Sequence, residues 1–421
     1  MMKTLYTLFI IITLLSVYTY ADEEIKDEIP YKWNSVQTPW INTKAVMAVI
    51  LDYSNFKQDQ NSINHVGNLD EFSKGEIRGI RMGVVGTFNF ERPWYYVAAF
   101  ALGAWDNGFD VVQREQFVWF DLAVAIPLWG DDAYFSIGKM KEPISQERIM
   151  ALNVEQTMER PLHLDALLPS RNMGMTIGDT LLNQSMTYKL GIFNDALEQE
   201  SSFADFSTQY IGRVTGLAYE DKENQSLLHL GLGYRYSDVK IGSIRYRASP
   251  EQSFVPDWVD TGKVSAQNSQ TTNLELSYIL GPMWFATEYT ATHLASKEHN
   301  DPNFYGYHAA ITYALTGEYR GYSKTMGIVN PLTPNSDFTK GGTGAIDISY
   351  RYSYLDLTSQ DIAGGELGIS TFGMSWYPSK EVKVQIQWSH MDLKSNDLAT
   401  QQVLSSSESD VLQLRWVYFY Q

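Results

Sequence analysis

Alternation of apolar and polar residues is the dominant pattern along the chain. In the stretch 345–357, AIDISYRYSYLDL, isoleucine and tyrosines occupy one parity, while Asp347, Arg351 and two serines occupy the other. A period of two places these two sets on opposite faces of a β-strand. Similar alternation recurs in 117–126, 227–236, 382–390 and 411–421. Long amphipathic helical patterns are scarce, so the pattern predicts an all-β protein.

The links between the expected strands are short and long in turn. Tight links with turn residues occur at 90–93, 129–132, 182–184, 222–225, 281–282 and 378–381. Longer polar links fall at about 54–75, 105–115, 144–170, 195–206, 237–270, 295–303, 358–364 and 394–408. In an antiparallel meander of about sixteen strands, this order puts the long links at one end. The link 318–342 breaks the order, and we expect a structured turn or an inward excursion there.

Residue placement indicates that this sheet crosses a membrane. After residue 21, no stretch approaches the roughly 20 consecutive apolar residues of a membrane-spanning helix, which leaves a closed barrel as the other way to cross. Tyrosine and tryptophan gather near the expected strand ends, as they do in interfacial girdles. A lipid-facing charge at mid-depth costs about 2–4 kcal/mol, so strand arginines should face a watery lumen and tyrosines should face lipid. The alternative fold is a secreted soluble β-sandwich that binds sugars.

The beginning of the chain and its charge bear on location and partners. Residues 1–21 combine a positive start, an apolar run and a small residue, Ala21, before an acidic segment, which predicts a cleaved signal peptide. Residues 22–421 then form the barrel domain. The net charge of −17 argues against nucleic acid as a partner, because such a surface needs a basic stripe.

Several stretches resemble the phosphate-selective porin O/P family of Gram-negative outer-membrane porins. They are 78–88, 136–148, 158–175, 244–251, 314–322, 344–357 and 364–379, spread over almost the whole mature chain. The resemblance implies a sixteen-stranded homotrimer in the outer membrane, with an inward-folded third loop and basic residues that select anions such as phosphate. The family's Arg-Arg pair is replaced here by Arg78-Gly79-Ile80-Arg81, and the chain is acidic. A general or cation-leaning diffusion porin is therefore the alternative.

The link 144–170 is the expected constriction, and arginines with lumen parity are the expected pore lining. The candidate selectivity residues are Arg81, Lys139, Lys141, Arg148, Arg160, Arg171, Arg213, Arg235, Arg245, Arg247, Arg351 and Arg415. Arginine offers forked donors to passing phosphates or carboxylates. Two alternatives stay open, namely that neighbours such as Glu159 and Arg160 pair to hold the loop, and that lipid exclusion alone turns arginines inward. Lys139 and Lys141 share the parity of Phe135 and Ile137, which are expected to face lipid.

An outer-membrane barrel enzyme is the remaining functional alternative. His229 and His308 have lumen parity, but neither a Gly-x-Ser-x-Gly nor a His-Glu-x-x-His run occurs. No cofactor or metal is therefore expected, and the expected partners are small hydrophilic solutes or anions, outer-membrane lipid and two further copies of the chain. At the C-terminus Gln421 follows Tyr420, where barrel strands usually end on an aromatic residue.

Overall fold

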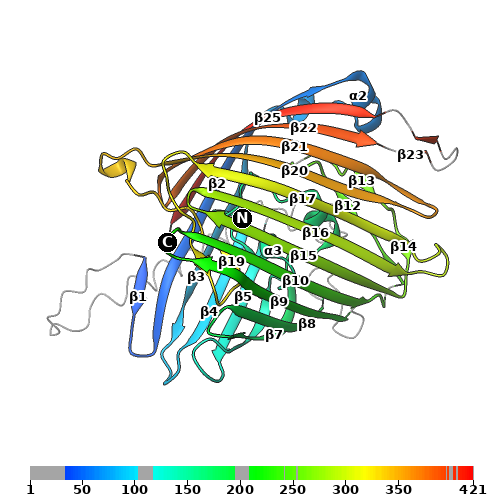
Figure 1. Cartoon of the computed structure of the whole chain (residues 1–421). Coiled ribbons are helices and arrows are strands. Elements are labelled where there is room, and N and C mark those ends of the chain that lie inside the picture. The colour runs from blue at the N-terminus through cyan, green and yellow to red at the C-terminus, as the bar shows by residue number, and fades with distance from the viewer. Residues whose placement is uncertain are drawn as a thin grey trace, which may run out of the picture.

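Sixteen long antiparallel strands close into one barrel (Figure 1). The computed structural model describes residues 34–102, 117–194, 208–240, 242–252, 255–394, 396–397, 402–403 and 406–420. The predicted signal peptide lies outside these residues. Each long strand pairs with the next, and β2 closes the barrel by pairing with β25. The prediction of a barrel of about sixteen strands is confirmed.

The barrel strands have the following bounds. They are β2 (Ile41–Gln58), β3 (Gly75–Phe88), β4 (Trp94–Leu102), β5 (Phe117–Pro127), β6 (Tyr134–Met140), β7 (Asn172–Leu181), β8 (Met186–Asn194), β9 (Thr208–Asp221), β10 (Ser226–Asp238), β15 (Asn268–Leu280), β16 (Met283–Ala295), β17 (Asn303–Ala314), β20 (Ala345–Ser359), β21 (Ile362–Ser379), β22 (Val382–Lys394) and β25 (Ser407–Tyr420). The short strands are β1 (Ser35–Gln37), which pairs with β2, and the pair β23 (Asn396–Asp397) and β24 (Gln402–Val403).

The tight turns fall where the sequence predicts them, and one expected long link is absent. Strands β15 and β16, for example, are joined by residues 281–282 alone. The prediction of a long link at 358–364 is wrong. Strands β20 and β21 continue through this stretch, and Gln360 and Asp361 alone form the turn between them. Gln360 takes a positive φ of 57°, which a tight turn between strands requires. The pairing register shifts just before this turn, between Asp356 and Thr358.

Strand parity follows the prediction except at bulges. In β20, Asp347 and Arg351 are buried inside the barrel, while Ile348 is 45% exposed on the outer face. In β5 the register shifts at Phe120, so Val118 and Phe120 both turn inward and Trp119 turns outward. A strict period of two in 117–126 would place Val118 and Phe120 on the face opposite Asp121. All three face inward instead, because a bulge inserts one extra residue and reverses the parity beyond it.

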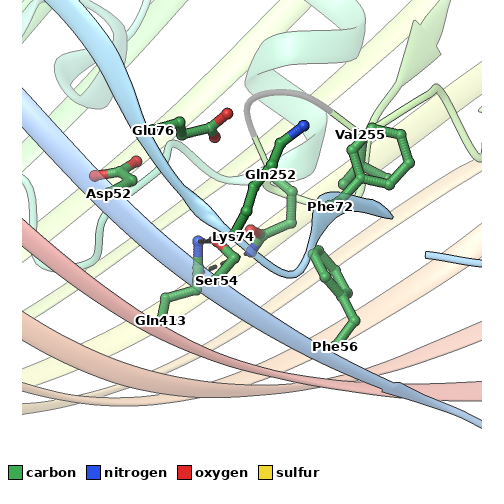
Figure 2. A pocket seen from close by; sticks show the side chains of 9 residues that line it. All are labelled: Asp52, Ser54, Phe56, Phe72, Lys74, Glu76, Gln252, Val255 and Gln413. Atoms are coloured by element: carbon green, nitrogen blue, oxygen red, sulfur yellow. Dashed lines mark hydrogen bonds between the residues drawn. The ribbon is translucent and has the colours of Figure 1, made fainter. Parts of the chain in front are cut away.

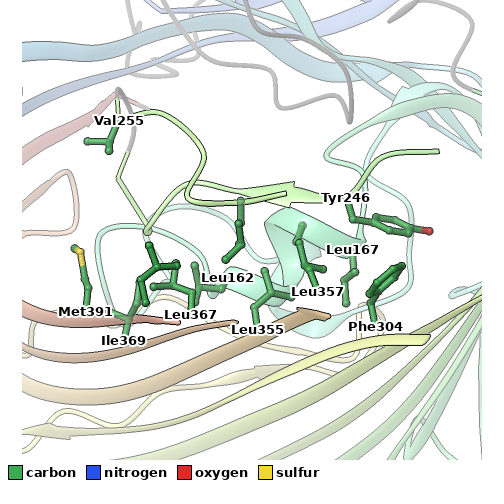
Figure 3. Packing of buried hydrophobic residues seen from close by; sticks show 14 of the residues in the cluster. Leu162, Leu167, Tyr246, Val255, Phe304, Leu355, Leu357, Leu367, Ile369 and Met391 are labelled. Atoms are coloured by element: carbon green, nitrogen blue, oxygen red, sulfur yellow. The ribbon is translucent and has the colours of Figure 1, made fainter. Parts of the chain in front are cut away.

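Two long-loop segments fold into the barrel and fill much of its lumen. The first, 141–171, carries α3 (Gln146–Ile149) and α4 (Leu162–Leu167). The second, 239–267, carries β11 (Ser243–Ile244), β12 (Arg247–Ala248), β13 (Val259–Asp260) and β14 (Val264–Ser265). Figure 3 shows Leu162 and Leu167 beside the inward residues Leu355 and Leu367. A hydrophobic core therefore lies inside the barrel and joins both loops to its wall.

The long link between β17 and β20 is an inward excursion, as expected. It forms a small hairpin from β18 (Tyr322–Ser323) and β19 (Ile328–Val329), followed by the 3-10 helix η3 (Phe338–Lys340). Val329 is fully buried in a cluster with Met150 and Trp284. The hairpin thus enters the barrel from the short-turn end and packs against the 141–171 loop on the side that faces that end. Short turns face the periplasm in outer-membrane barrels.

The other helices are brief elements of the link between β2 and β3. They are α2 (Gln60–Val66) and the 3-10 helix η2 (Asp70–Phe72). Asp59 caps α2 by accepting a hydrogen bond from the Ser62 amide at 2.6 Å. Among the described residues, no helix has the length and apolar character needed to span a membrane.

Candidate pore constriction

The 141–171 loop is fixed to one side of the barrel. Ser145 Oγ and the Glu147 amide both donate to the Glu288 carboxylate of β16, at 2.6 and 2.7 Å. Further on, the Leu162 amide donates to Ser353 Oγ of β20 at 3.0 Å. Buried polar groups need such partners, because an unpaired one costs about 1–3 kcal/mol. The loop therefore lies against β16 and β20 and leaves the wall of β3 to β6 to face its other side.

Two glycines make room for this docking. A side chain at Gly233 of β10 would overlap the carbonyl oxygen of Ile144. At Gly306 of β17, a Cβ would lie 2.5 Å from Cβ of His163. Glycine is needed at both positions because the loop backbone approaches the strand closely.

The side of the loop that faces β3 to β6 meets a cluster of arginines from β3 and from the end of the loop itself, just before β7. Arg78 donates two hydrogen bonds to Glu159, at 3.1 and 3.2 Å. Arg171 binds Asp121 in the same forked manner, at 3.0 and 3.1 Å. Arg160 lies 2.7 Å from Glu155 within the loop. These three ion pairs define a ring of charge that we call the constriction.

Arg81 also reaches the constriction, but it differs from the other arginines there because it has no carboxylate partner among the described residues. Its guanidinium carbon lies 4.7 Å from the ring centroid of Phe120, and that of Arg171 lies 3.9 Å from the same ring. Phe120 thus positions both guanidinium groups by cation–π contact. Among the described residues, Arg81 has no ion pair, and its buried Nε has no hydrogen-bond partner.

Two lysines also reach the constriction without a carboxylate partner among the described residues. Lys141 Nζ donates to the carbonyl oxygens of Ile149 and Met150, at 3.4 and 2.7 Å. Lys383 Nζ, from β22, donates to the Glu155 carbonyl oxygen at 2.8 Å. Both lysines are thus held by neutral backbone groups. Carboxylates still act on them electrostatically without direct contact, Asp121 and Glu155 on Lys141 and Asp347 and Glu155 on Lys383.

Four of the candidate arginines are buried in ion pairs and do not face water. Arg415 binds Asp52 at 2.6 and 2.7 Å and also contacts Glu159. Arg351 binds Glu251, and it is only 3% exposed. Buried pairs also join Arg213 to Glu275 and Arg235 to Glu142, both at 2.8 Å. The expectation that inward arginines face water is therefore wrong for these residues, because folded loops fill the lumen beside them.

The remaining candidates lie apart from the constriction or beneath it. Arg148 is buried under α4, where it binds Asp165 and the carbonyl oxygens of Leu164 and Leu168. Arg245 and Arg247 pair with Asp260 and Asp257 inside the second loop. Lys139 is only 4% exposed, although its register partner Leu122 is 44% exposed on the outer face. The structure thus brings together Arg81, Lys141, Arg160 and Arg171 and places the other candidates elsewhere.

The loop's charged residues do not pair with their sequence neighbours. Glu159 binds Arg78 and Arg415, while Arg160 binds Glu155. The alternative in which Glu159 pairs with Arg160 is therefore not what the structure shows. The partners instead link the loop to the barrel wall and brace the loop internally.

Two titratable groups of the loop have shifted pKa values. Burial, with repulsion from Glu155, raises the pKa of Glu147 to about 7. Burial, with repulsion from His308, lowers the pKa of His163 well below its usual range. His163 is held by Thr290 Oγ1 at 2.8 Å and by His308 Nδ1 at 3.0 Å. His163 is therefore a neutral structural residue at physiological pH. Among the described residues, no group of three acidic or histidine side chains could hold a metal ion.

A small pocket lies at the long-loop side of the constriction (Figure 2). It is lined by Asp52, Ser54, Phe56, Phe72, Lys74, Glu76, Gln252, Val255 and Gln413. The ammonium group of Lys74 lies 6.0 Å from the ring centroid of Phe72. The pocket therefore combines one cation, two carboxylates, aromatic surface and amide groups.

Sequence reasoning missed several residues of the constriction. Arg78 belongs to a bulge in β3, so simple alternation gave it no defined face. A strict period of two places Phe120 on the face opposite Asp121, because the period does not reveal the bulge in β5. Lys383 alternates with Val382 and Val384 and carried a usable signal, since its parity is that of the inward Gln385 and Gln387.

The chain matches one protein family and two curated relatives. Residues 47–420 match the phosphate-selective porin O and P family, so the chain belongs to that family. Porin O of Pseudomonas aeruginosa is 22% identical over 276 residues, which cover 58% of this chain and 60% of that protein. A second curated relative matches over about half of its own length, 49%. The matches thus span 49% and 60% of the length of these relatives.

Solved outer-membrane proteins share the fold. OmpT of Vibrio cholerae superposes with a TM-score of 0.55 at 9% identity, over 91% of this chain and 99% of that one. An anion-selective porin from Comamonas acidovorans gives a TM-score of 0.53 at 10% identity, over 90% and 100%. Identities this low show the fold alone. The chain is thus a member of the porin O and P family and has the barrel fold of these outer-membrane proteins.

Proposed function

We propose that the barrel is a passive diffusion channel for small hydrophilic solutes with a modest preference for anions, phosphate among them. The observation that carries this proposal is the charge balance of the constriction. Its acids, Asp121, Glu155 and Glu159, are each bound by an arginine. Arg81 adds positive charge that no described carboxylate neutralises at close range.

Charge balance matters more here than the net charge of the chain. In salt solution, a charge acts over about one Debye length, roughly 8–10 Å at physiological ionic strength. Acidic residues outside the barrel therefore have little effect at the constriction. The lumen also keeps Lys44 and Lys189, which have inward register positions and no ion pair among the described residues. The anion selectivity named for the Comamonas acidovorans porin, a fold neighbour, is consistent with this proposal.

The test is a reversal-potential measurement on single channels in a planar bilayer under a KCl gradient. The proposal expects stepwise ohmic conductance and a potential set mainly by chloride. A potential set mainly by potassium would refute the anion preference and favour the cation-leaning alternative. Phosphate should reduce chloride current at millimolar concentration if phosphate enters the same constriction.

Assembly and processing are part of the same proposal. We infer a homotrimer, because one structure of OmpT from Vibrio cholerae, a fold neighbour, is described as a trimer form. We also infer removal of residues 1–21 on export. Mass measurement of the detergent-purified protein, native and denatured, gives the number of copies and the mature N-terminus.

A further inference from the structure

The lumen wall beyond the constriction is apolar on the side of β2 to β5. In-register partners form one row across it, Lys44 with Val85, Val85 with Val97, and Val97 with Ala123. The next row up carries Val46, Gly83 and Ala99, and it ends at Asp121 of β5, whose carboxylate is bound by Arg171. Residues directly opposite each other share a face, and these positions share the face of Arg81. They are half-buried, so part of each side chain remains open to the lumen.

This wall departs from what a water-filled barrel normally presents. Porin interiors are polar. The inward positions of β15 obey that rule, with Ser269, Thr271, Asn273, Glu275 and Ser277. On β3 and β4, by contrast, valine and alanine face the lumen although no lipid requires them there. We call the inward surface formed by Val46, Val85, Val97, Ala99 and Ala123 the apolar wall.

Cations bracket the apolar wall. Arg81 lies four residues before Val85 on β3, which is about 13 Å along a strand. At the other end, Lys44 is the direct register partner of Val85. At the long-loop side of the constriction, Lys74 lines the pocket of Figure 2 with Phe56, Phe72 and Val255. Two carboxylates, Asp52 and Glu76, line the same pocket, and Asp52 is bound by Arg415. A positive charge therefore adjoins apolar surface at the pocket, at Phe120 in the constriction, and along the apolar wall.

We propose that the channel favours organic anions with an apolar body, such as aromatic carboxylates, over equally charged ions that lack one. This inference rests on the proposed anion-preferring channel and names its substrate class. A carboxylate would pass from Lys74 to Arg81 and on to Lys44, while its apolar body leaves water against Phe72, Phe120 and the apolar wall. Inorganic ions gain only the electrostatic stabilisation from the cations along this path.

The test compares benzoate with acetate, which carry the same charge. Reversal potentials with potassium benzoate on one side and potassium acetate on the other give their permeability ratio. The proposal expects benzoate, although larger, to permeate at least as well as acetate. A double variant, Val85→Thr with Val97→Thr, keeps the shape and β-branching of the wall and removes its apolar character. It should lower the benzoate-to-acetate ratio by about threefold, the effect of losing partial burial of one ring face.

Controls separate the possible failures. Val97→Ile keeps the wall apolar and should retain the ratio. The chloride-to-acetate ratio, measured on the same channels, reports any general change in pore width. If benzoate permeates less than acetate in the parent protein, or if the threonine variant lowers both ratios alike, the inference is wrong while the anion-preferring channel stands. If potassium carries the current in KCl, the proposed function itself fails.

Discussion

Replacing Arg81 by glutamine isolates the charge of one constriction residue. Most arginines near it are bound to carboxylates, so removing them would leave a buried acid unpaired. Within the described part of the chain, the contact that Arg81 would lose is the one with Phe120, and such contacts contribute about 0.5–1 kcal/mol at exposed sites. We therefore expect Arg81→Gln to fold and assemble normally, so that its effect on permeation can be attributed to charge.

The size of the effect follows from Coulomb's law. A chloride ion passing about 5 Å from the guanidinium gains about 1 kcal/mol at an effective dielectric constant of about 60. Screening in 0.1 M salt reduces this to about 0.6 kcal/mol. Potassium loses the same amount, so removing the charge shifts the difference between the two ions by about 1.2 kcal/mol. The chloride-to-potassium permeability ratio should fall by about five- to tenfold.

Reversal potentials in a KCl gradient measure this ratio directly. Lys380→Gln is the matched control, since Lys380 lies in the tight turn between β21 and β22 with its side chain 73% exposed. That variant should leave the ratio unchanged. Adding Asp121→Asn to Arg81→Gln restores the local charge and should restore most of the ratio. A ratio that does not fall in Arg81→Gln, or that falls equally in Lys380→Gln, would refute the reasoning.

Three further predictions concern pH, stability and loop position. Burial raises the pKa of Glu147 to about 7, so this residue ionises as pH rises from 6 to 8. The chloride-to-potassium permeability ratio should therefore fall about twofold over that range. This fall should vanish in Glu147→Gln. The same raised pKa means that the contribution of neutral Glu147 to stability is complete below its ordinary value of 4.5 and is lost as pH approaches about 7. Arg415→Met leaves Asp52 buried without its partner and should cost about 3–5 kcal/mol, seen as a lower temperature for loss of the folded band on gels, whereas an unchanged temperature would contradict a stabilising role. Gly233→Ala forces the loop away from the wall at Ile144 and should reduce single-channel conductance by roughly half, and parent-like conductance would show that the loop yields without narrowing the passage.

The strand pattern was readable because lipid imposes a strict rule on every strand. A tyrosine face and a charged face cannot exchange when one side is hydrocarbon, so alternation in β20 identified the inward Arg351. Turn chemistry likewise identified the tight links, since a short meander turn depends on local residues. Parity failed at Phe120 and gave no answer at Arg78, because a bulge is set by pairing with a neighbouring strand.

The sequence by itself determined the class of fold, the approximate number of strands and the face of the charges on regular strands, because these follow from local periodicity and the cost of charge in lipid. Only the tertiary structure decided which charges act on a passing ion. Arg351 and Arg81 have the same inward parity, yet one is neutralised by Glu251 from a distant loop and the other is not. Such pairing depends on how loops remote in sequence pack into the lumen, and Coulomb interactions fall with distance in space, not along the chain.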